Sequence, residues 1–272
     1  MSKRVAGIFM MVVGLVAWGA SRAEAQSGGE GALCGSRGLQ PCGAGLRCMG
    51  GRPEVDVPGT CQRPGQGTSQ RESYYLIVAR DLRRCASPFC GGFFISLANQ
   101  KTMQCPNGGV SATCYVAGVD LSAMGLDPGQ AATVIAGNTV VLGRLAPRRG
   151  FQGVSDLVGR AAWRAPTDTR PTEPLYRAEF DGRVCITFPC PNIDEEKLNT
   201  HERQTVSDVD LTTAPGTDED REHGQDAIYT RGQGLIASGH NVVVEDAGPA
   251  GDAEVLQAEQ FFLPVTPKVT SP

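Results

Sequence analysis

The sequence predicts a β-rich α+β protein in which two tandem small β-barrel-like units follow a small disulfide-stapled module. Its 35 glycines and 18 prolines favour many turns and short strands over a helical bundle. Apolar residues make up 40% of the chain, which is enough for a folded core. Several short stretches recur about 95 residues apart, which favours two units in series. The net charge of -4 gives no reason to expect a nucleic-acid partner.

Residues 1–25 have the composition of a secretory signal peptide. A basic start at Lys3 and Arg4 is followed by an uncharged apolar run over residues 5–20 and by the small-residue pattern A-E-A, which ends at Ala25. This run is shorter than the roughly 20 residues that a membrane-spanning helix needs, which disfavours an anchor. We expect cleavage after Ala25, export to the periplasm or the medium, and no transmembrane segment in the mature chain.

Export decides how the cysteines are interpreted. Thiols oxidise outside the cytoplasm, and an even number of cysteines then predicts disulfides. Zinc is disfavoured because the chain has no C-x-x-C pair and no histidine near a cysteine pair. We expect structural disulfides among ten cysteines, in blocks of four, four and two: Cys34, Cys42, Cys48, Cys61, Cys85, Cys90, Cys105, Cys114, Cys185 and Cys190.

Residues 26–64 are predicted to form a module of their own around the first four cysteines, which are spaced C-x7-C-x5-C-x12-C. A segment this short cannot bury a sizeable core, so two disulfides must hold it, and three pairings stay open. It is either a small recognition module or, as we favour, a protease-resistant cap. The polar, glycine-rich residues 65–73 mark a linker.

Two units, residues 74–165 and 166–272, are predicted from an internal repeat. The pattern C-x4-C, with adjacent proline and phenylalanine before its second cysteine, occurs at residues 85–90 and again at 185–190. Two further stretches recur in the same order: V-D-L-S at 119–122 as V-D-L-T at 209–212, and V-V-L-G at 140–143 as L-I-A-S-G at 235–239.

The first unit is predicted to hold five strands and one short helix. Runs rich in β-branched and aromatic residues, in part alternating, predict the strands. Asp127 as N-cap and Pro128 at the first helical position predict a helix that ends near residue 135. The strands are placed at 74–79, 93–97, 113–119, 139–145 and 154–163.

The second unit is predicted to follow the same order. Thr217 and the acidic residues 218–220 predict a helix start that favours negative charge, and the helix runs to about Thr230. Three strands, a helix and two strands is also the order of an OB-type barrel, which we take as an analogy. Extended segments are placed at 175–180, 183–187, 204–211, 234–238, 241–245 and 260–265.

The two C-x4-C loops, 85–90 and 185–190, are each predicted to close on themselves and to pin a corner between strands. Each closed loop of six residues contributes roughly 2 kcal/mol through the entropy of the unfolded chain, and a proline stiffens it further. The remaining pair, Cys105 and Cys114, is predicted to staple the hairpin around residues 106–109.

The run R-R-C-A-S-P-F-C-G-G-F-F at 83–94 resembles an uncharacterised family of exported proteins common in myxobacteria. The stretches 114–117, 183–191 and 260–263 resemble the same family, so the likeness covers about residues 74–265. The four-cysteine block looks like modules found ahead of such domains. The family has no known function, so the resemblance implies export and a shared architecture, and supplies no activity and no catalytic residue.

No catalytic motif that we weighed fits the chain, since G-x-S-x-G, H-E-x-x-H and a P-loop are absent. The best support for an enzyme is a polar cluster in the second unit. It comprises His201, Glu202, Asp208, Asp210 and His240. A hydrolase with an unfamiliar site would need these residues to meet in a cleft.

Three other groups have a structural interpretation that we favour over a functional one. The acids at 218–226 are read as a solvated helix start rather than a calcium site. Asp120 and Asp210 are read as turn caps rather than a paired carboxylate site. Trp163 and Tyr176 are read as packing between the units rather than as a surface for sugar rings.

The sequence therefore predicts an exported, disulfide-stabilised binding or interaction protein without a cofactor, and favours a binder over an enzyme. Its partner would be a protein or a surface glycan. One variant is a protease inhibitor, because a disulfide-stiffened loop suits a rigid inhibitory segment. The alternative from another class is the exported hydrolase.

Overall fold

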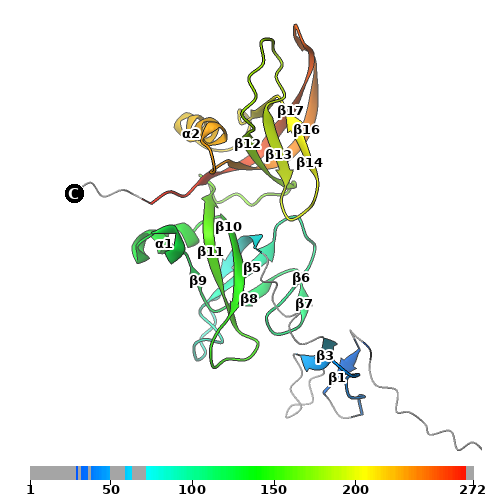
Figure 1. Cartoon of the computed structure of the whole chain (residues 1–272). Helices are drawn as coiled ribbons and strands as arrows, with labels where there is room; N and C mark the ends of the chain where they lie inside the picture. The colour runs from blue at the N-terminus through cyan, green and yellow to red at the C-terminus, as the bar shows by residue number, and fades with distance from the viewer. Residues whose placement is uncertain (1–28, 30–31, 36–37, 50–58, 63–71, 268–272) are drawn as a thin grey trace, which may run out of the picture.

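The computed structural model describes residues 29, 32–35, 38–49, 59–62 and 72–267 (Figure 1). The predicted signal peptide and most of the predicted linker lie outside the described residues. No helix within the described ranges is long and apolar enough to cross a membrane. Five disulfides join cysteines of this chain, which indicates folding in an oxidising compartment.

The first half of the body, residues 73–165, is built from antiparallel strands in the order β8-β5-β4-β10-β11, and β9 pairs with β11 in parallel. Its core contains Ile95, Val116 and Leu157, and Val134 of α1 packs into the same cluster. The strands are β4 (Ser73–Arg80), β5 (Phe93–Leu97), β6 (Met103–Gln104), β7 (Val110–Ser111), β8 (Cys114–Val116), β9 (Val119–Asp120), β10 (Thr139–Pro147) and β11 (Ser155–Arg164); the helices are η2 (Ser122–Met124) and α1 (Pro128–Ile135).

The second half, residues 166–264, has the matching order β14-β13-β12-β16-β17, and β15 pairs with β17 in parallel. Ile193, Leu256 and Phe261 are completely buried in its core. The elements are β12 (Leu175–Phe180), β13 (Ile193–Lys197), β14 (Arg203–Val206), β15 (Asp208–Asp210), α2 (Asp218–Tyr229), β16 (Leu235–Gly248) and β17 (Gly251–Pro264).

The two halves agree in register as well as in order. The pairing of β10 with β11 shifts at Gly143, and the pairing of β16 with β17 shifts at Gly239. Both positions need glycine, because a Cβ atom would lie 2.2 Å from the Val158 carbonyl oxygen and 2.0 Å from that of Gln257. Because the register shifts at the corresponding glycine in both hairpins, each residue of one hairpin can be matched with a residue of the other.

The halves join through their last strands. Near their ends, β11 and β17 pair antiparallel, with Trp163 opposite Pro264 and Arg164 opposite Leu263. Trp163 is buried in a shared apolar cluster and its indole Nε1 donates to the Gly234 carbonyl at 3.0 Å. The pairing makes one continuous sheet whose hydrogen-bonded path is open and ends at β8 and β14. The predicted barrel-like closure is therefore not what this path of strands shows.

Two asparagines bind the halves to each other in a matching way. The Asn99 amide donates to the Leu175 and Leu198 carbonyls at 2.7 and 3.0 Å. The Asn199 amide donates to the carbonyls of Tyr74 and Ala98 at 2.8 and 3.0 Å. Both asparagines have left-handed backbone, with φ of 58° and 57°. Each half thus offers the other the same contact, as in an isologous interface.

Most predicted elements are present, and the helix starts are confirmed. The Asp127 carboxylate accepts from the Gln130 amide at 2.8 Å, and Thr217 caps α2 through the Asp220 amide at 3.1 Å. One prediction is wrong and one strand was not predicted. Residues 183–187 are part of a disulfide loop and not an extended strand. Strand β13, which the sequence pattern does not suggest, is present.

The N-terminal module has a three-stranded sheet in the order β1-β3-β2. Disulfides join Cys34 to Cys48 and Cys42 to Cys61, so one of the three open pairings is selected. Its strands are β1 (Leu33–Cys34), β2 (Arg47–Met49) and β3 (Gly59–Gln62).

Candidate functional site

The most distinctive loops of the body are the two disulfide loops, 81–92 between β4 and β5 and 181–192 between β12 and β13. The structure joins Cys85 to Cys90 and Cys185 to Cys190, the local pairs that the spacing predicts, and Cys105 to Cys114 in the hairpin. Each loop thus connects the first two strands of its half at a matching position, which makes the two directly comparable.

Both disulfide loops begin with the pattern D-x-R-x-C, which holds the loop entrance. The Asp81 carboxylate accepts from the Arg83 amide at 3.1 Å and from its guanidinium at 2.9 Å. Asp181 and Arg183 repeat the amide bond at 2.7 Å and the ion pair at 2.5 Å. The side-chain hydrogen bond from Arg83 lowers the pKa of Asp81, so this carboxylate stays ionised near neutral pH.

In the first half, the loop lies on an aromatic platform. The Arg83 guanidinium carbon lies 5.8 Å from the Phe94 ring centroid and 5.7 Å from that of Tyr115, which is the distance of a cation–π contact. The Tyr115 hydroxyl donates to the Pro88 carbonyl at 2.9 Å. Phe89 meets a phenylalanine of the β10–β11 hairpin edge to face. These contacts hold the loop against the sheet, although most of its residues, Phe89 included, remain exposed.

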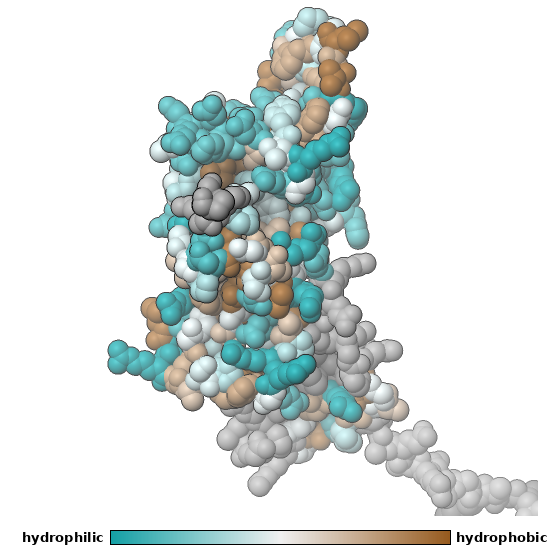
Figure 2. All heavy atoms as spheres, turned by 60° about the vertical axis from the view of Figure 1, so that its left-hand side comes forward, coloured by the Kyte–Doolittle hydropathy of each residue, from teal (hydrophilic) through white to brown (hydrophobic). Residues whose placement is uncertain are grey.

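In the second half, the loop presents apolar side chains to solvent. Val184 is 89% exposed, Ile186 is 102% exposed and Phe188 is 54% exposed, and we call these three residues the apolar tip. The loop leans on the β16–β17 hairpin, because the Ala250 amide donates to the Phe188 carbonyl at 3.0 Å. Figure 2 shows hydrophobic side chains gathered at the end of the molecule where this hairpin turns.

The second candidate is a cavity of about 400 Å³ at the other end of the second half, which we call the polar cavity. Glu195 of β13 is only 2% exposed and lies in its wall. Its Oε1 accepts from the Asn241 amide at 2.9 Å and the Gln204 amide at 3.2 Å. Within the described part of the chain, Glu195 Oε2 and Asn241 Oδ1 have no hydrogen-bond partner. The lining residues are Tyr176, Glu195, Lys197, His201, Glu202, Arg203, Gln204 and Asn241.

The electrostatics of the polar cavity disfavour an isolated negative charge on Glu195. Burial raises the pKa of the Glu195 carboxyl, and the negative charge of Glu254 raises it further. The two neighbouring cations already have carboxylate partners: Lys197 binds Glu202 at 2.8 Å and Arg203 binds a different glutamate at 2.8 Å. The Glu195 carboxylate therefore has no cationic partner among the described side chains.

The five residues of the predicted hydrolase cluster do not come together. His201 and Glu202 line the polar cavity, whereas Asp208, Asp210 and His240 are not among its lining residues. Asp210 instead accepts from the Thr212 amide at 2.8 Å, which makes it a turn cap. The predicted five-residue site is therefore not assembled, since just two of its members share this cavity.

The favoured structural interpretations of the other acids hold. Asp120 accepts from the Ser122 amide at 2.9 Å, so both matched aspartates cap turns within their own halves. In the acidic helix, Asp218 pairs with Arg221 at 2.7 Å and Asp220 closes the capping box. These carboxylates stabilise the first turn of α2.

Trp163 packs between the halves as predicted, but Tyr176 does not. Trp163 is buried in the cluster that contains Leu175 and Phe262. Tyr176 packs against the core of the second half and lines the polar cavity. The interpretation of Tyr176 as an inter-unit contact is therefore wrong, because its strand turns that side chain toward the interior of one half.

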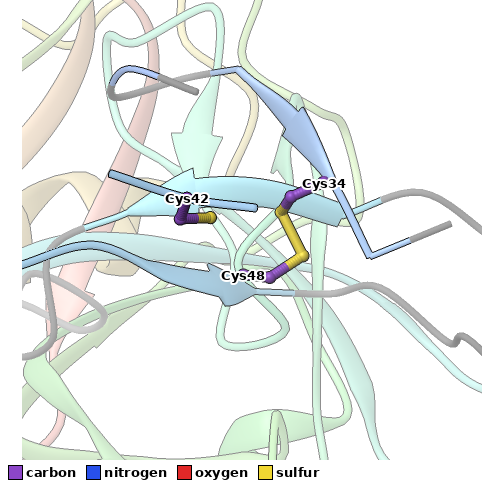
Figure 3. Close-up of side chains that lie close together, drawn as sticks. All are labelled: Cys34, Cys42 and Cys48. Carbon is purple, nitrogen blue, oxygen red and sulfur yellow. A yellow bond between two sulfur atoms is a disulfide. The ribbon is translucent and has the colours of Figure 1, made fainter. Parts of the chain in front are cut away.

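Three cysteine sulfurs of the N-terminal module lie close together, which is the geometry that a metal site also has (Figure 3). Here Cys34 is bonded to Cys48, and the neighbouring Cys42 is bonded to Cys61. Metals bind the thiolate, and a disulfide sulfur is not a thiolate. The closeness of the sulfurs results from two adjacent disulfides.

Two features of these sites were not predicted from the sequence: the buried Glu195 and the loop pattern D-x-R-x-C. The stretch I-D-E-E-K at 193–197 is too polar to suggest a strand, so its inward-facing carboxylate went unnoticed. Extending the repeat by its offset of 100 residues would have found it, because residues 93–97 are a predicted strand. The same comparison aligns Asp81 with Asp181 and Arg83 with Arg183.

The fold and sites define a disulfide-stabilised, β-rich protein with two similar halves. No curated protein and no solved structure matches the chain. Residues 74–268 match the family described as Domain of unknown function (DUF6748), and because this match covers most of the chain, the protein belongs to that family. The match spans both halves and leaves out the four-cysteine module.

Proposed function

We propose that this chain is an exported binding protein that contacts a protein partner through the apolar tip. The observation that carries the proposal is the exposure of Val184, Ile186 and Phe188 on a loop of the second half that a disulfide closes. Burying an apolar side chain away from water is favourable, and these three side chains do not gain that free energy in the free protein. Contact with a partner would bury these side chains and gain that free energy, and exposed apolar patches typically mark such contacts.

The loop is built to bind with little loss of entropy. The Cys185–Cys190 disulfide closes it, the Asp181–Arg183 ion pair holds its entrance, and the Ala250 amide bonds its far side to the hairpin. Ordering a loop on binding costs free energy that a rigid loop does not lose. A preorganised apolar loop suits a concave apolar surface on a partner, such as the substrate cleft of a protease.

The fold supports this location if each half is an OB-like barrel that arose by duplication, which we also propose. We number the five antiparallel strands of each half in chain order: β4, β5, β8, β10 and β11 in the first half, and β12, β13, β14, β16 and β17 in the second. In both halves strand one pairs with strands two and four, strand two also pairs with strand three, and strand four also pairs with strand five. A helix lies between strands three and four. The parallel pairs β9–β11 and β15–β17 would bring strand three to strand five. OB-type barrels bind with the loops between strands one and two and strands four and five, which here hold the apolar tip and the β16–β17 turn.

Export is part of the same proposal. The signal-peptide composition of residues 1–25 supports it, as does the oxidation of the described cysteines to disulfides. Peptide mass mapping of the protein recovered from its host tests it, and the expected N-terminus is Gln26. An N-terminus at Met1 in the recovered folded protein would contradict export by cleavage.

The binding test places a photo-crosslinking amino acid at residue 186 of the full exported chain. We expect a specific crosslink to one protein, which Val184→Asp in the same chain abolishes by adding a charge to the tip. The matched control places the crosslinker at the equally exposed Leu82 of the first half, which is 83% exposed. Equal crosslinking from both positions would contradict a specific tip. Binding to a surface glycan that Ile186→Asp does not reduce would also overturn the proposal.

The protease-inhibitor variant has its own outcome. A panel of serine and cysteine proteases is assayed with wild-type protein and with Ile186→Asp. Inhibition that only the wild type produces would identify the partner as a protease. A crosslink to a protein without protease activity would retain the binding proposal and remove the inhibitor variant.

A further inference from the structure

The two halves differ most at the end of the core opposite to their disulfide loops. The strand registers align three buried residues of the first half with three polar ones of the second. Ile95, Cys114 and Leu145 correspond to Glu195, Gln204 and Asn241. The first set lies in the apolar core, at most 5% exposed. The second set lines the polar cavity.

The covering segment differs in the same way. In the first half, residues 98–113 connect β5 to β8 and include the β6–β7 hairpin, whose Met103 and Cys105 are buried against the core. In the second half, only residues 198–202 connect β13 to β14. The end of the second half is therefore open to solvent at a cavity where the first half is sealed.

The polar cavity contains two buried acceptors without a hydrogen bond. Glu195 Oε2 and Asn241 Oδ1 have no hydrogen-bond partner among the residues that the structure describes. Both amide groups that bind Glu195 donate to its other oxygen, Oε1. A buried acceptor without a partner is costly, and in native proteins it calls for a bound group that donates to it.

We propose that the polar cavity binds a primary ammonium group, either of a small free amine or of a lysine side chain from a partner. An ammonium carries several N–H donors, so it can bond to both Glu195 Oε2 and Asn241 Oδ1. It also supplies the positive charge that the Glu195 carboxylate lacks, since Lys197 is paired with Glu202. This inference does not depend on the apolar tip, which lies on a different loop.

Other ligand classes fit the cavity less well. A hard divalent cation seeks about six to eight oxygen ligands, and two unpartnered oxygens fall well short. A neutral hydroxyl could donate to the same atoms but would leave the Glu195 carboxylate without a counter-charge. The cavity volume of about 400 Å³ is ample for an alkylammonium group.

Calorimetric titration of the full exported chain tests the proposal. The probe is methylammonium chloride, and the matched control is tetramethylammonium chloride, which has the same charge and no N–H donor. We expect saturable binding of methylammonium alone. Glu195→Gln should weaken it at least about tenfold, because a hydrogen bond to a charged group is lost. Glu219→Gln on the exposed face of α2 should leave it unchanged.

The source of the amine is distinguished with Nα-acetyl-lysine methylamide. Tighter binding of this compound than of methylammonium would favour a lysine of a partner protein, and equal binding would favour a free amine. Absence of binding by both compounds would overturn the proposal, and so would equal binding of tetramethylammonium. Calcium chloride binding in place of the amines would overturn it as well.

A second variant keeps the test decisive if Glu195→Gln fails to fold. Asn241→Leu installs the residue type that the first half carries at this position, where Leu145 is buried. It removes one of the two acceptors and retains the carboxylate. Weaker methylammonium binding by a folded Asn241→Leu protein is expected, and unchanged binding would contradict the assigned site.

Discussion

The two halves share their strand order, their bulges and their contacts with each other, but they differ in what fills one end of the core and in how the disulfide loop packs. The first half buries Ile95 and Leu145 beneath a covering hairpin and packs its disulfide loop on Phe94 and Tyr115. The second half exposes Ile186 at its loop and places Glu195 inside. One connectivity thus accommodates both arrangements. Both features on which the proposals rest, the apolar tip and the polar cavity, lie in the second half.

The largest effect should follow from opening the cover of the first half. Replacing Cys105 and Cys114 by alanine releases a loop with a sequence separation of 9 and loosens the hairpin over the core. We expect a loss of about 3 kcal/mol in the free energy of unfolding, from the entropy of the unfolded chain. Urea denaturation of the full chain measures it.

The matching control removes Cys185 and Cys190 from the exposed loop of the second half. That loop is shorter and covers no core, so the loss should be about 2 kcal/mol or less. If removal of either disulfide lowers the free energy of unfolding by the same amount, the β6–β7 hairpin does not stabilise the first half by covering its core. The two halves would then not differ in this respect.

The next largest effect should be equal in the two halves. Asn99→Ala and Asn199→Ala each remove hydrogen bonds to the backbone of the opposite half and place alanine at a positive φ. We expect each to cost about 2 kcal/mol in the free energy of unfolding, from backbone groups left unpaired and from strain. Thermal and urea unfolding measure both.

Glycine variants separate the two causes. Asn99→Gly and Asn199→Gly tolerate the positive φ, so they lose the hydrogen bonds without the strain. Suppose that replacing one asparagine greatly lowers the free energy of unfolding and replacing the other does not. The two asparagines would then not have equivalent roles at the junction, which would weaken the proposal of duplication.

A smaller effect of opposite sign should follow from making the second half resemble the first. Glu195→Ile with Asn241→Leu replaces a buried carboxylate and its amide by apolar residues that the first half uses at these positions. We expect a gain of about 1–2 kcal/mol in the free energy of unfolding near pH 7. Because burial raises the folded pKa of Glu195, the wild type is more stable with this group protonated.

That shift fixes the sign of the pH dependence. The favourable contribution of Glu195 is present below its unfolded pKa and is lost as pH rises through its raised folded pKa. The advantage of the double variant over the wild type should therefore be smaller near pH 4 than near pH 7, as measured by urea unfolding at both. An advantage that is equal at both pH values would show that the carboxyl group is not its source.

Sequence patterns predicted the strands that consist of apolar residues and the helices that begin with capping residues. Strand β5, a run of mostly aromatic and aliphatic residues, and α1, with Asp127 and Pro128 at its start, are where the pattern placed them. Strand β13 was missed because three of its five residues are acidic. Pairing with β12 and β14 makes it a strand, and those are tertiary contacts that no local pattern contains.

The candidate sites were partly predictable for the same reason. The closure of the C-x4-C loops followed from their spacing, whereas the exposure of Ile186 depends on how the loop leans on the β16–β17 hairpin. Conversely, the predicted polar cluster failed because His240 and His201 lie on elements that do not bring them to one cavity. A polar residue at a core position, such as Glu195, is visible in sequence only by comparison with its apolar counterpart in the other half.

The smallest expected effect on stability belongs to the residue with the largest expected effect on binding. Ile186 is fully exposed, so Ile186→Asp should change the free energy of unfolding by less than about 0.5 kcal/mol. Leu82→Asp in the loop of the first half should be equally neutral by urea unfolding. Only Ile186→Asp should lower partner capture. A marked loss of stability in Ile186→Asp would mean that the side chain packs within the protein, and the tip would then not be a recognition surface.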